Sequence, residues 1–62
     1  MNKEVENYIK KKMERASVCW KRAREDYEKG NMETSASYYA SATRLYSQCA
    51  SDLIDGTGFK EE

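Results

Sequence analysis

Two cysteines, Cys19 and Cys49, carry the most reactive side chains of this sequence, and histidine is absent. Histidine is the usual general base and metal ligand near neutral pH, so its absence removes the commonest route to catalysis. The cysteines lack the close spacing of zinc or redox motifs. Each lies among apolar residues, so we expect both to be small, reduced, buried side chains, with a disulfide between two copies as the alternative.

Acidic side chains and loops provide no stronger catalytic pattern. Glu14 and the Glu25-Asp26 pair are the obvious candidate carboxylates, but each has Lys or Arg one helical turn away, which is typical of a solvated helix face. No glycine-rich loop follows a strand, and no serine stands in a nucleophile elbow. We therefore predict a protein that is not an enzyme and that needs neither a metal nor a cofactor.

Basic side chains form the one charge pattern with functional content. The chain is neutral overall, yet residues 1–29 hold nine Lys or Arg against six Asp or Glu, and residues 30–62 hold two against five. The candidate face for nucleic acid or an acidic partner consists of Lys10, Lys11, Arg15, Lys21, Arg22 and Arg24. Such a face can contact a phosphate backbone by charge and shape. A solvated face balanced by nearby carboxylates is the favoured interpretation, so nucleic acid is the second choice of partner.

These residues lie on two proline-free segments that flank a Lys29-Gly30-Asn31 turn. The apolar residues of the first segment recur every three or four positions, which predicts an amphipathic helix over residues 3–29, with Asn2 as its N-cap. They are Val5, Ile9, Met13, Ala16, Cys19, Trp20, Ala23 and Tyr27.

The second segment carries a strict seven-residue repeat, which predicts a helix over residues 32–55 with this seam against the first helix. The seam consists of Met32, Ala36, Tyr39, Thr43, Tyr46, Ala50 and Leu53. The stretch Asp55-Gly56-Thr57-Gly58 is expected to end the helix, and residues 57–62 to form a frayed tail.

Gly30 is predicted to be the left-handed residue that closes the first helix, with Asn31 as the N-cap of the second. A turn this short forces the helices antiparallel, so facing residues have numbers that sum to about 62. Trp20 would then face Ala42. The sequence thus predicts a single all-α domain over residues 1–62, an antiparallel two-helix hairpin.

A lone hairpin buries only the strip between its helices, whereas ordering each residue costs roughly 1.5 kcal/mol. The apolar arc of the second helix is also wider than one partner helix needs. We therefore expect a homodimer that forms a four-helix bundle. The residues expected at the self-association interface are Tyr38, Ala42, Leu45, Tyr46 and Cys49. A monomer, or a helix supplied by another protein, is the alternative.

The first residues are charged from Lys3 onward and lack the apolar run of a signal peptide. The longest charge-free stretch, residues 34–43, is half the length of a membrane span. These features favour a cytoplasmic protein with no membrane partner.

Two resemblances bear on function. Residues 27–49, with Gly30, Tyr39, Ala42 and Tyr46, resemble part of a tetratricopeptide repeat, although such repeats need about three copies for stability. In length, mid-chain turn and the stretch at residues 45–49, Leu-Tyr-Ser-Gln-Cys, the chain resembles the layout of the Rop family of plasmid RNA-binding proteins. That resemblance implies a dimeric hairpin that holds paired RNA loops on its first helices.

The favoured function is a small non-enzymatic module for protein–protein interaction or regulation, of the kind common among bacterial and phage accessory proteins. The alternative is Rop-like binding of structured RNA, or of DNA, by the basic first helix of a dimer.

Overall fold

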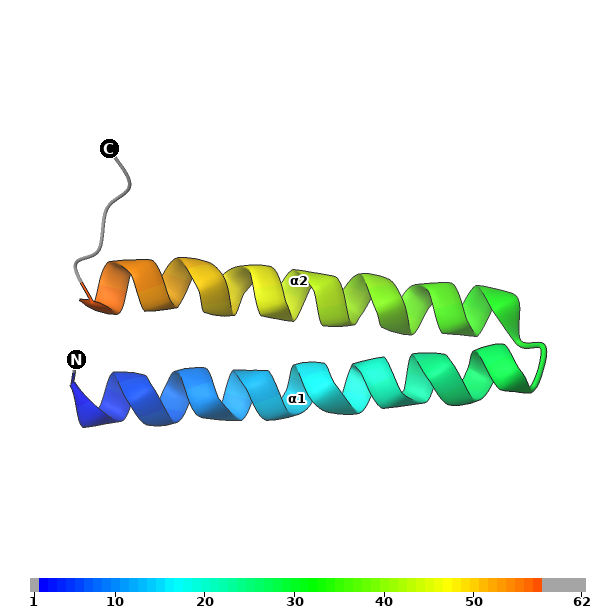
Figure 1. Ribbon diagram of the computed structural model, residues 1–62, viewed down its shortest axis with the longest axis horizontal. Coiled ribbons are helices and arrows are strands. Elements are labelled where there is room, and N and C mark those ends of the chain that lie inside the picture. Colours follow the sequence, from blue (N-terminus) through cyan, green and yellow to red (C-terminus); the bar gives the residue numbers. More distant parts are fainter. Residues whose placement is uncertain (1, 58–62) are drawn as a thin grey trace.

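The computed structural model describes residues 2–57, which form two antiparallel α-helices joined by a tight turn (Figure 1). Helix α1 spans Lys3–Glu28 and helix α2 spans Met32–Thr57. The helices lie side by side along their whole lengths, so the start of α1 and the end of α2 are neighbours at the end opposite the turn. The predicted all-α hairpin is confirmed.

Helix α1 begins where its N-cap residue supplies a hydrogen-bond acceptor. Asn2 has an extended backbone, and its Oδ1 accepts a hydrogen bond of 2.7 Å from the backbone N–H of Glu4. Glu4 and Glu6 place negative charge in the first turn, where it interacts favourably with the positive end of the helix dipole. The sequence-based prediction of Asn2 as N-cap is therefore confirmed.

The turn is a Schellman motif centred on Gly30. The N–H of Gly30 donates to the carbonyl oxygen of Tyr27 at 3.0 Å, and the N–H of Asn31 donates to that of Asp26 at 2.8 Å. Gly30 has a φ of +85°, as predicted for the left-handed residue. The carbonyl oxygen of Asn31 accepts the N–H of Ser35 at 2.9 Å, which places Asn31 at the predicted N-cap position of α2.

Helix α2 runs to Thr57, two residues past the predicted end near residue 55 and within the Asp55-Gly56-Thr57-Gly58 stretch that was expected to end it. It continues through Gly56, although a glycine inside a helix costs about 1 kcal/mol. Among residues 2–57, Gly30 alone has a positive φ. The frayed tail predicted for residues 57–62 thus begins inside α2 at Thr57, and residues 58–62 lie outside the described residues.

The two helices meet along a seam of mostly small residues spaced by seven. The seam residues are Ile9, Ala16 and Ala23 on α1, and Ser35, Ala42 and Cys49 on α2, all at most 3% exposed. Three positions after each comes a half-buried residue: Lys12, Cys19 and Asp26 on α1, and Tyr38, Leu45 and Asp52 on α2. Small seam residues allow a short distance between helix axes.

Side chains of this seam reach the backbone of the opposite helix. Ser35 Oγ donates to the carbonyl oxygen of Ala23 at 2.7 Å, and Cys49 Sγ donates to that of Ile9 at 3.9 Å. A short side chain can bridge to an opposite backbone only when the two helices are close. The seam therefore brings the two backbones near each other at both ends of the hairpin.

The seam predicted for α2 is wrong. Tyr39 is half-buried, and the other six predicted residues are exposed: Met32, Ala36, Thr43, Tyr46, Ala50 and Leu53. Trp20 was predicted to face Ala42, but its ring contacts the Tyr39 ring instead. The physical reason is size, since the seam of small residues permits a closer approach than one that includes two tyrosines.

The antiparallel register is close to the predicted one. Lys12 contacts Asp52, and Ser35 contacts Ala23. The numbers of the residue pairs in contact across the seam sum to between 58 and 64, against the predicted 62. The error in the sequence-based prediction therefore lies in the rotation of α2 about its axis, not in its alignment along α1.

Candidate interaction surfaces

An apolar surface runs along one side of the hairpin. It consists of Met13, Trp20 and Tyr27 from α1, and Met32, Tyr39, Tyr46 and Leu53 from α2; we call it the aromatic face. Apart from Met32, which opens α2, each follows a buried seam residue by four positions, which turns it to the same side of the seam on both helices. The rings of Trp20 and Tyr39 join the two rows edge to face, with centroids 4.8 Å apart and planes at 81°.

Much of the aromatic face lies in water. Trp20 is 50% exposed, Tyr27 58% and Met32 55%, whereas Met13 and Leu53 are each 37% exposed. On α2 the face continues onto three small exposed residues, Ala36, Thr43 and Ala50. Together with the large side chains of α2 they make up the seven-residue repeat that was predicted to face α1. Helix α2 thus carries two heptad stripes, one filled by α1 and one open.

The opposite side of the hairpin is basic and shallowly grooved. A groove of about 420 Å³ follows α1 and is lined by Lys11, Glu14, Arg15, Val18 and Cys19. A second groove, of about 260 Å³, lies between the helices and is lined by Arg15, Cys19, Ser41, Arg44 and Leu45. Arg15 and Cys19 line both grooves, which are therefore neighbours on this side. We call this side the basic groove.

The structure divides the six predicted basic residues between different sides of α1, although all six are exposed. Lys11 and Arg15 line the basic groove, and Arg22 reaches across the same side to the Tyr38 ring, 5.3 Å from its centroid. Lys10 and Arg24 each follow a buried seam residue directly. At 100° per residue this turns them toward the aromatic face, and Lys21 points away from the seam.

Arg44 is a basic-groove residue that the sequence analysis missed. It comes from α2, whereas the predicted basic patch was drawn on the first helix alone. A signal was present, because Arg44 is the one basic residue of α2 and follows the buried Ala42 by two positions. Only the register between the helices shows that it shares a groove with Arg15.

Ion pairs between basic side chains and carboxylates are rare in the described part of the chain. Within residues 2–57, the Lys12–Asp52 contact is the sole ion pair within 4.0 Å. The basic residues of the groove therefore have no ion-paired carboxylate in this part of the chain, although i,i+4 neighbours of opposite charge are frequent in the sequence.

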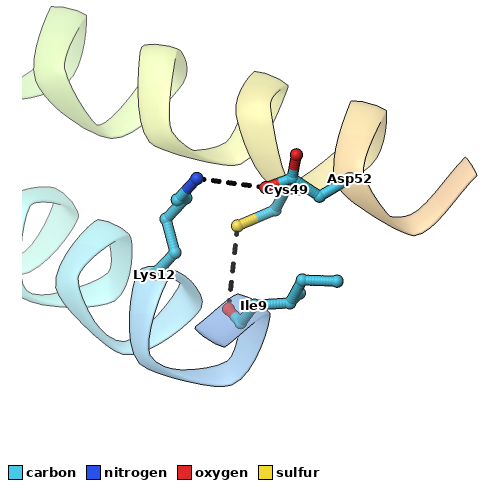
Figure 2. Close-up of polar contacts among 4 residues, drawn as sticks. All are labelled: Ile9, Lys12, Cys49 and Asp52. Carbon is cyan, nitrogen blue, oxygen red and sulfur yellow. Dashed lines mark hydrogen bonds and ion pairs between the residues drawn. The ribbon is translucent and has the colours of Figure 1, made fainter. Parts of the chain in front are cut away.

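The Lys12–Asp52 pair connects the helices near their free ends (Figure 2). Lys12 Nζ lies 3.0 Å from Asp52 Oδ2 and 4.2 Å from the centroid of the Tyr8 ring. The side chain of Lys12 is only 12% exposed, and it lies beside the Cys49–Ile9 hydrogen bond. Contact with Tyr8, and then with Asp52, raises the pKa of Lys12 above its usual value of 10.5. Lys12 therefore links the two helices through an ion pair.

The residues predicted for self-association fall into three different places. Ala42 and Cys49 are 0% and 2% exposed, because they pack against α1 of the same chain. Tyr38 and Leu45 are half-buried on the side of the basic groove. Tyr46, 45% exposed, is the one member that lies on the aromatic face. The α1 part of this face was missed, although its large residues follow one another at intervals of seven.

Neither helix of the described part of the chain is long and apolar enough to cross a membrane. Within residues 2–57, no three Cys, Asp or Glu side chains gather into a group that could hold a metal ion. Comparison with known protein families, curated proteins and solved structures finds no match to this chain. The aromatic face and the basic groove are therefore the two surfaces from which function is inferred.

Proposed function

We propose that this protein is a small non-enzymatic interaction module of the cytoplasm, and that it pairs with itself through the aromatic face to form a four-helix bundle. The observation that supports this is the exposure of the face. Trp20 and Tyr27 leave half or more of their surface in water, although they lie beside the seam and not on the outer side of the hairpin.

The hairpin alone buries little apolar area. Its buried apolar residues are Ile9, Ala16, Ala23, Ala42 and Cys49, of which only Ile9 is large. An aromatic side chain can bury about 150–250 Å². Covering the exposed half of Trp20 would thus remove about 100 Å² from water, which is worth about 2.5 kcal/mol. A partner on the aromatic face supplies burial that the two helices cannot supply to each other.

The size of the face suits a specific complex. A helix of 26 residues is about 39 Å long at 1.5 Å per residue, and two helices side by side are about 20 Å wide. The face therefore offers about 800 Å² per copy, which is the area of a standard stable protein interface.

The environment of Cys49 supports a non-enzymatic role. Both cysteines are free. Cys49 is 2% exposed, and its Sγ is engaged with the carbonyl oxygen of Ile9. A nucleophile must reach its substrate, and this thiol is covered by the two helices. Cys19 was also expected to be buried, but it is half-buried and lines the basic groove.

Sedimentation equilibrium at tens of micromolar tests self-association. We expect twice the chain mass of 7.2 kDa, and dissociation when Trp20→Glu or Tyr46→Glu places a charge on the aromatic face. Val18→Glu is the matched control, because Val18 is 61% exposed and lines the basic groove. A wild-type mass near 7.2 kDa would refute the proposal.

A second function is favoured by the basic groove. Arg44 joins Lys11, Arg15 and Arg22 on one side, and none of these is ion-paired within residues 2–57. Such a cluster suits the phosphate backbone of structured RNA. The cluster includes α2, so the Rop-like use of the first helix alone is replaced by a groove between the two helices.

Titration of an RNA stem-loop at 50 and 200 mM salt tests this second function. Binding should fall steeply with salt and should be lost in the Arg15→Ala/Arg44→Ala double variant. Lys21→Ala is the control, because Lys21 lies on the outer side of α1. Absence of binding at 50 mM salt would exclude RNA as the partner.

A further inference from the structure

We propose a specific geometry for the pair: α1 of the second copy packs across α2 of the first, about a two-fold axis parallel to the helices. This inference rests on the proposed self-association and adds which helices meet and which side chains interlock. It places Met13, Trp20 and Tyr27 of each copy over Ala36, Thr43 and Ala50 of the other.

The side chains of the two helices are complementary in size. On the aromatic face, α1 presents three large residues at intervals of seven: Met13, Trp20 and Tyr27. On the same side, α2 presents three small exposed residues at intervals of seven: Ala36, Thr43 and Ala50. Side chains that recur every seven residues are the pattern by which one helix inserts knobs into the holes of another. Large residues over small ones fill the space between helices without voids.

The register of these pairs follows from the symmetry. A two-fold axis parallel to the helices leaves each residue of the second copy at its original height along the bundle. Within one hairpin, four of the five contacts between the helices join residues whose numbers sum to 58–60, and the fifth, made by the long Lys12 side chain, sums to 64. Trp20 of the second copy is thus level with Tyr39 of the first, since their numbers sum to 59. Side chains on a helix slant toward its N-terminus, so Trp20 leans toward Thr43, one turn further along α2. The other two pairs, Met13 with Ala50 and Tyr27 with Ala36, have the same offset of one turn.

The same lean of about one helical turn brings all three pairs together. The intrachain register follows from contacts on the seam, namely those of Ser35 and Cys49 with the opposite backbone. Because each large residue of α1 has its small counterpart on α2 at the same offset, one placement of the second copy serves all three pairs. This match in size and spacing supports a second copy as the occupant of the aromatic face.

Charge favours the same arrangement. Helix α1 carries eight basic and six acidic residues, whereas α2 carries one basic and three acidic residues. An axis perpendicular to the helices would instead place α1 beside α1. The positions between its large residues on this side are Lys10, Ser17 and Arg24, so that pairing would bring like charges together and offer no row of small residues.

Filling one hole tests the interlocking. We expect Thr43→Trp to weaken the dimer at least tenfold, because two large side chains then compete for the same space. Trp20→Ala in the same chain should restore at least part of that loss, since the large and small partners are then exchanged. Gln48→Trp is the control, because Gln48 is exposed and turned about 140° away from Thr43 on α2, and it should leave the dissociation constant unchanged. A Thr43→Trp dimer as tight as the wild type would overturn the proposed contact.

The position of the two turns tests the axis itself. A parallel axis brings both turns to the same end of the bundle, within its width of about 20 Å, whereas a perpendicular axis separates them by the helix length of about 39 Å. Lys29→Cys in a Cys19→Ala/Cys49→Ser background provides one spin label beside each turn. Cys49→Ser keeps a hydrogen-bond donor at the seam.

Double electron–electron resonance on this variant should give a label separation of about 20–30 Å. A separation of 40 Å or more would overturn the geometry and leave self-association intact. Circular dichroism and sedimentation of the unlabelled background establish first that it is helical and dimeric. If the wild-type chain sediments as a monomer, the proposed function itself fails, and the two failures are thereby distinguished.

Discussion

Ser35 and Ala23 are joined by a hydrogen bond of 2.7 Å from the serine Oγ to the alanine carbonyl oxygen, across the two helices. Cys49 and Ile9 repeat this arrangement two heptads away, with a distance of 3.9 Å from Sγ to the carbonyl oxygen. The seam thus combines small side chains with direct contact to the opposite backbone. Close packing of the helices, and not burial of large side chains, defines how they meet.

We predict that Ser35→Ala lowers the free energy of unfolding by about 1 kcal/mol, the net value of one buried hydrogen bond. Urea denaturation followed by circular dichroism measures this change. Ser37→Ala is the matched control, because Ser37 is an exposed serine of the same helix and should change stability by less than about 0.5 kcal/mol. Equal effects of the two substitutions would contradict the assigned role of Ser35.

Ala42 lies midway between Ser35 and Cys49, and its counterpart Ala16 lies midway between their two acceptors; both are fully buried. We predict that Ala42→Ser is tolerated, because its hydroxyl can donate to the carbonyl oxygen of Ala16 in the same way. Ala42→Leu should destabilise by about 1–3 kcal/mol, since it forces the helices apart. Thermal unfolding of both variants is the measurement. A leucine variant as stable as the wild type would show that the close approach is not required.

Lys12 should stabilise the hairpin in a manner that depends on alkaline pH. Its pKa is raised in the folded state, so the stabilisation is fully present below its usual value of 10.5 and is lost as pH rises through the raised value. The stability difference between the wild type and Lys12→Met should therefore be constant from about pH 7 to pH 9 and shrink above about pH 10.5.

Urea denaturation across this range measures the difference. Lys12→Arg is the control, because a guanidinium stays charged above pH 12 and should retain its pairing with Asp52 where lysine loses it. Loss of the arginine variant's stability at the same pH as the wild type would contradict the assigned role of Lys12.

Asp26 should be a residue whose replacement stabilises the protein. Its Oδ2 is buried and has no hydrogen-bond partner within the described residues, and its charge lies in the last turn of α1, where the helix dipole disfavours it. We predict that Asp26→Leu raises the free energy of unfolding by about 1 kcal/mol. Glu28→Leu is the control. Glu28 is exposed in the same turn, and its replacement removes the same charge. An equal gain from both would assign the effect to charge alone.

Gly30→Ala should cost about 1 kcal/mol, because Gly30 has a φ of +85°. A Cβ at this position would meet no atom within 4 Å, so the cost is purely conformational. Gly30→Asn should cost less, since asparagine tolerates the left-handed region better. Thermal unfolding compares the stability of the two variants. Equal losses of stability would contradict the assignment of the cost to the positive φ of Gly30.

The helices, their antiparallel order and the turn could all be predicted from the sequence, because the signals act over a few residues. Asn2 caps α1 through a neighbouring N–H, and Gly30 allows the left-handed backbone that ends the helix. The seven-residue repeat on α2 also proved real. It was assigned to the wrong neighbour, because it lies on the open aromatic face and not against α1.

Only the tertiary structure decided which of the two stripes on α2 meets α1. Both repeat every seven residues, so periodicity cannot separate them. The choice depends on how closely two backbones can approach, and the side-chain contact between Ser35 and Ala23 requires the stripe of small residues. The same packing brings Arg44 beside Arg15 from the other helix, a juxtaposition that depends on the register between the helices and that no local pattern encodes.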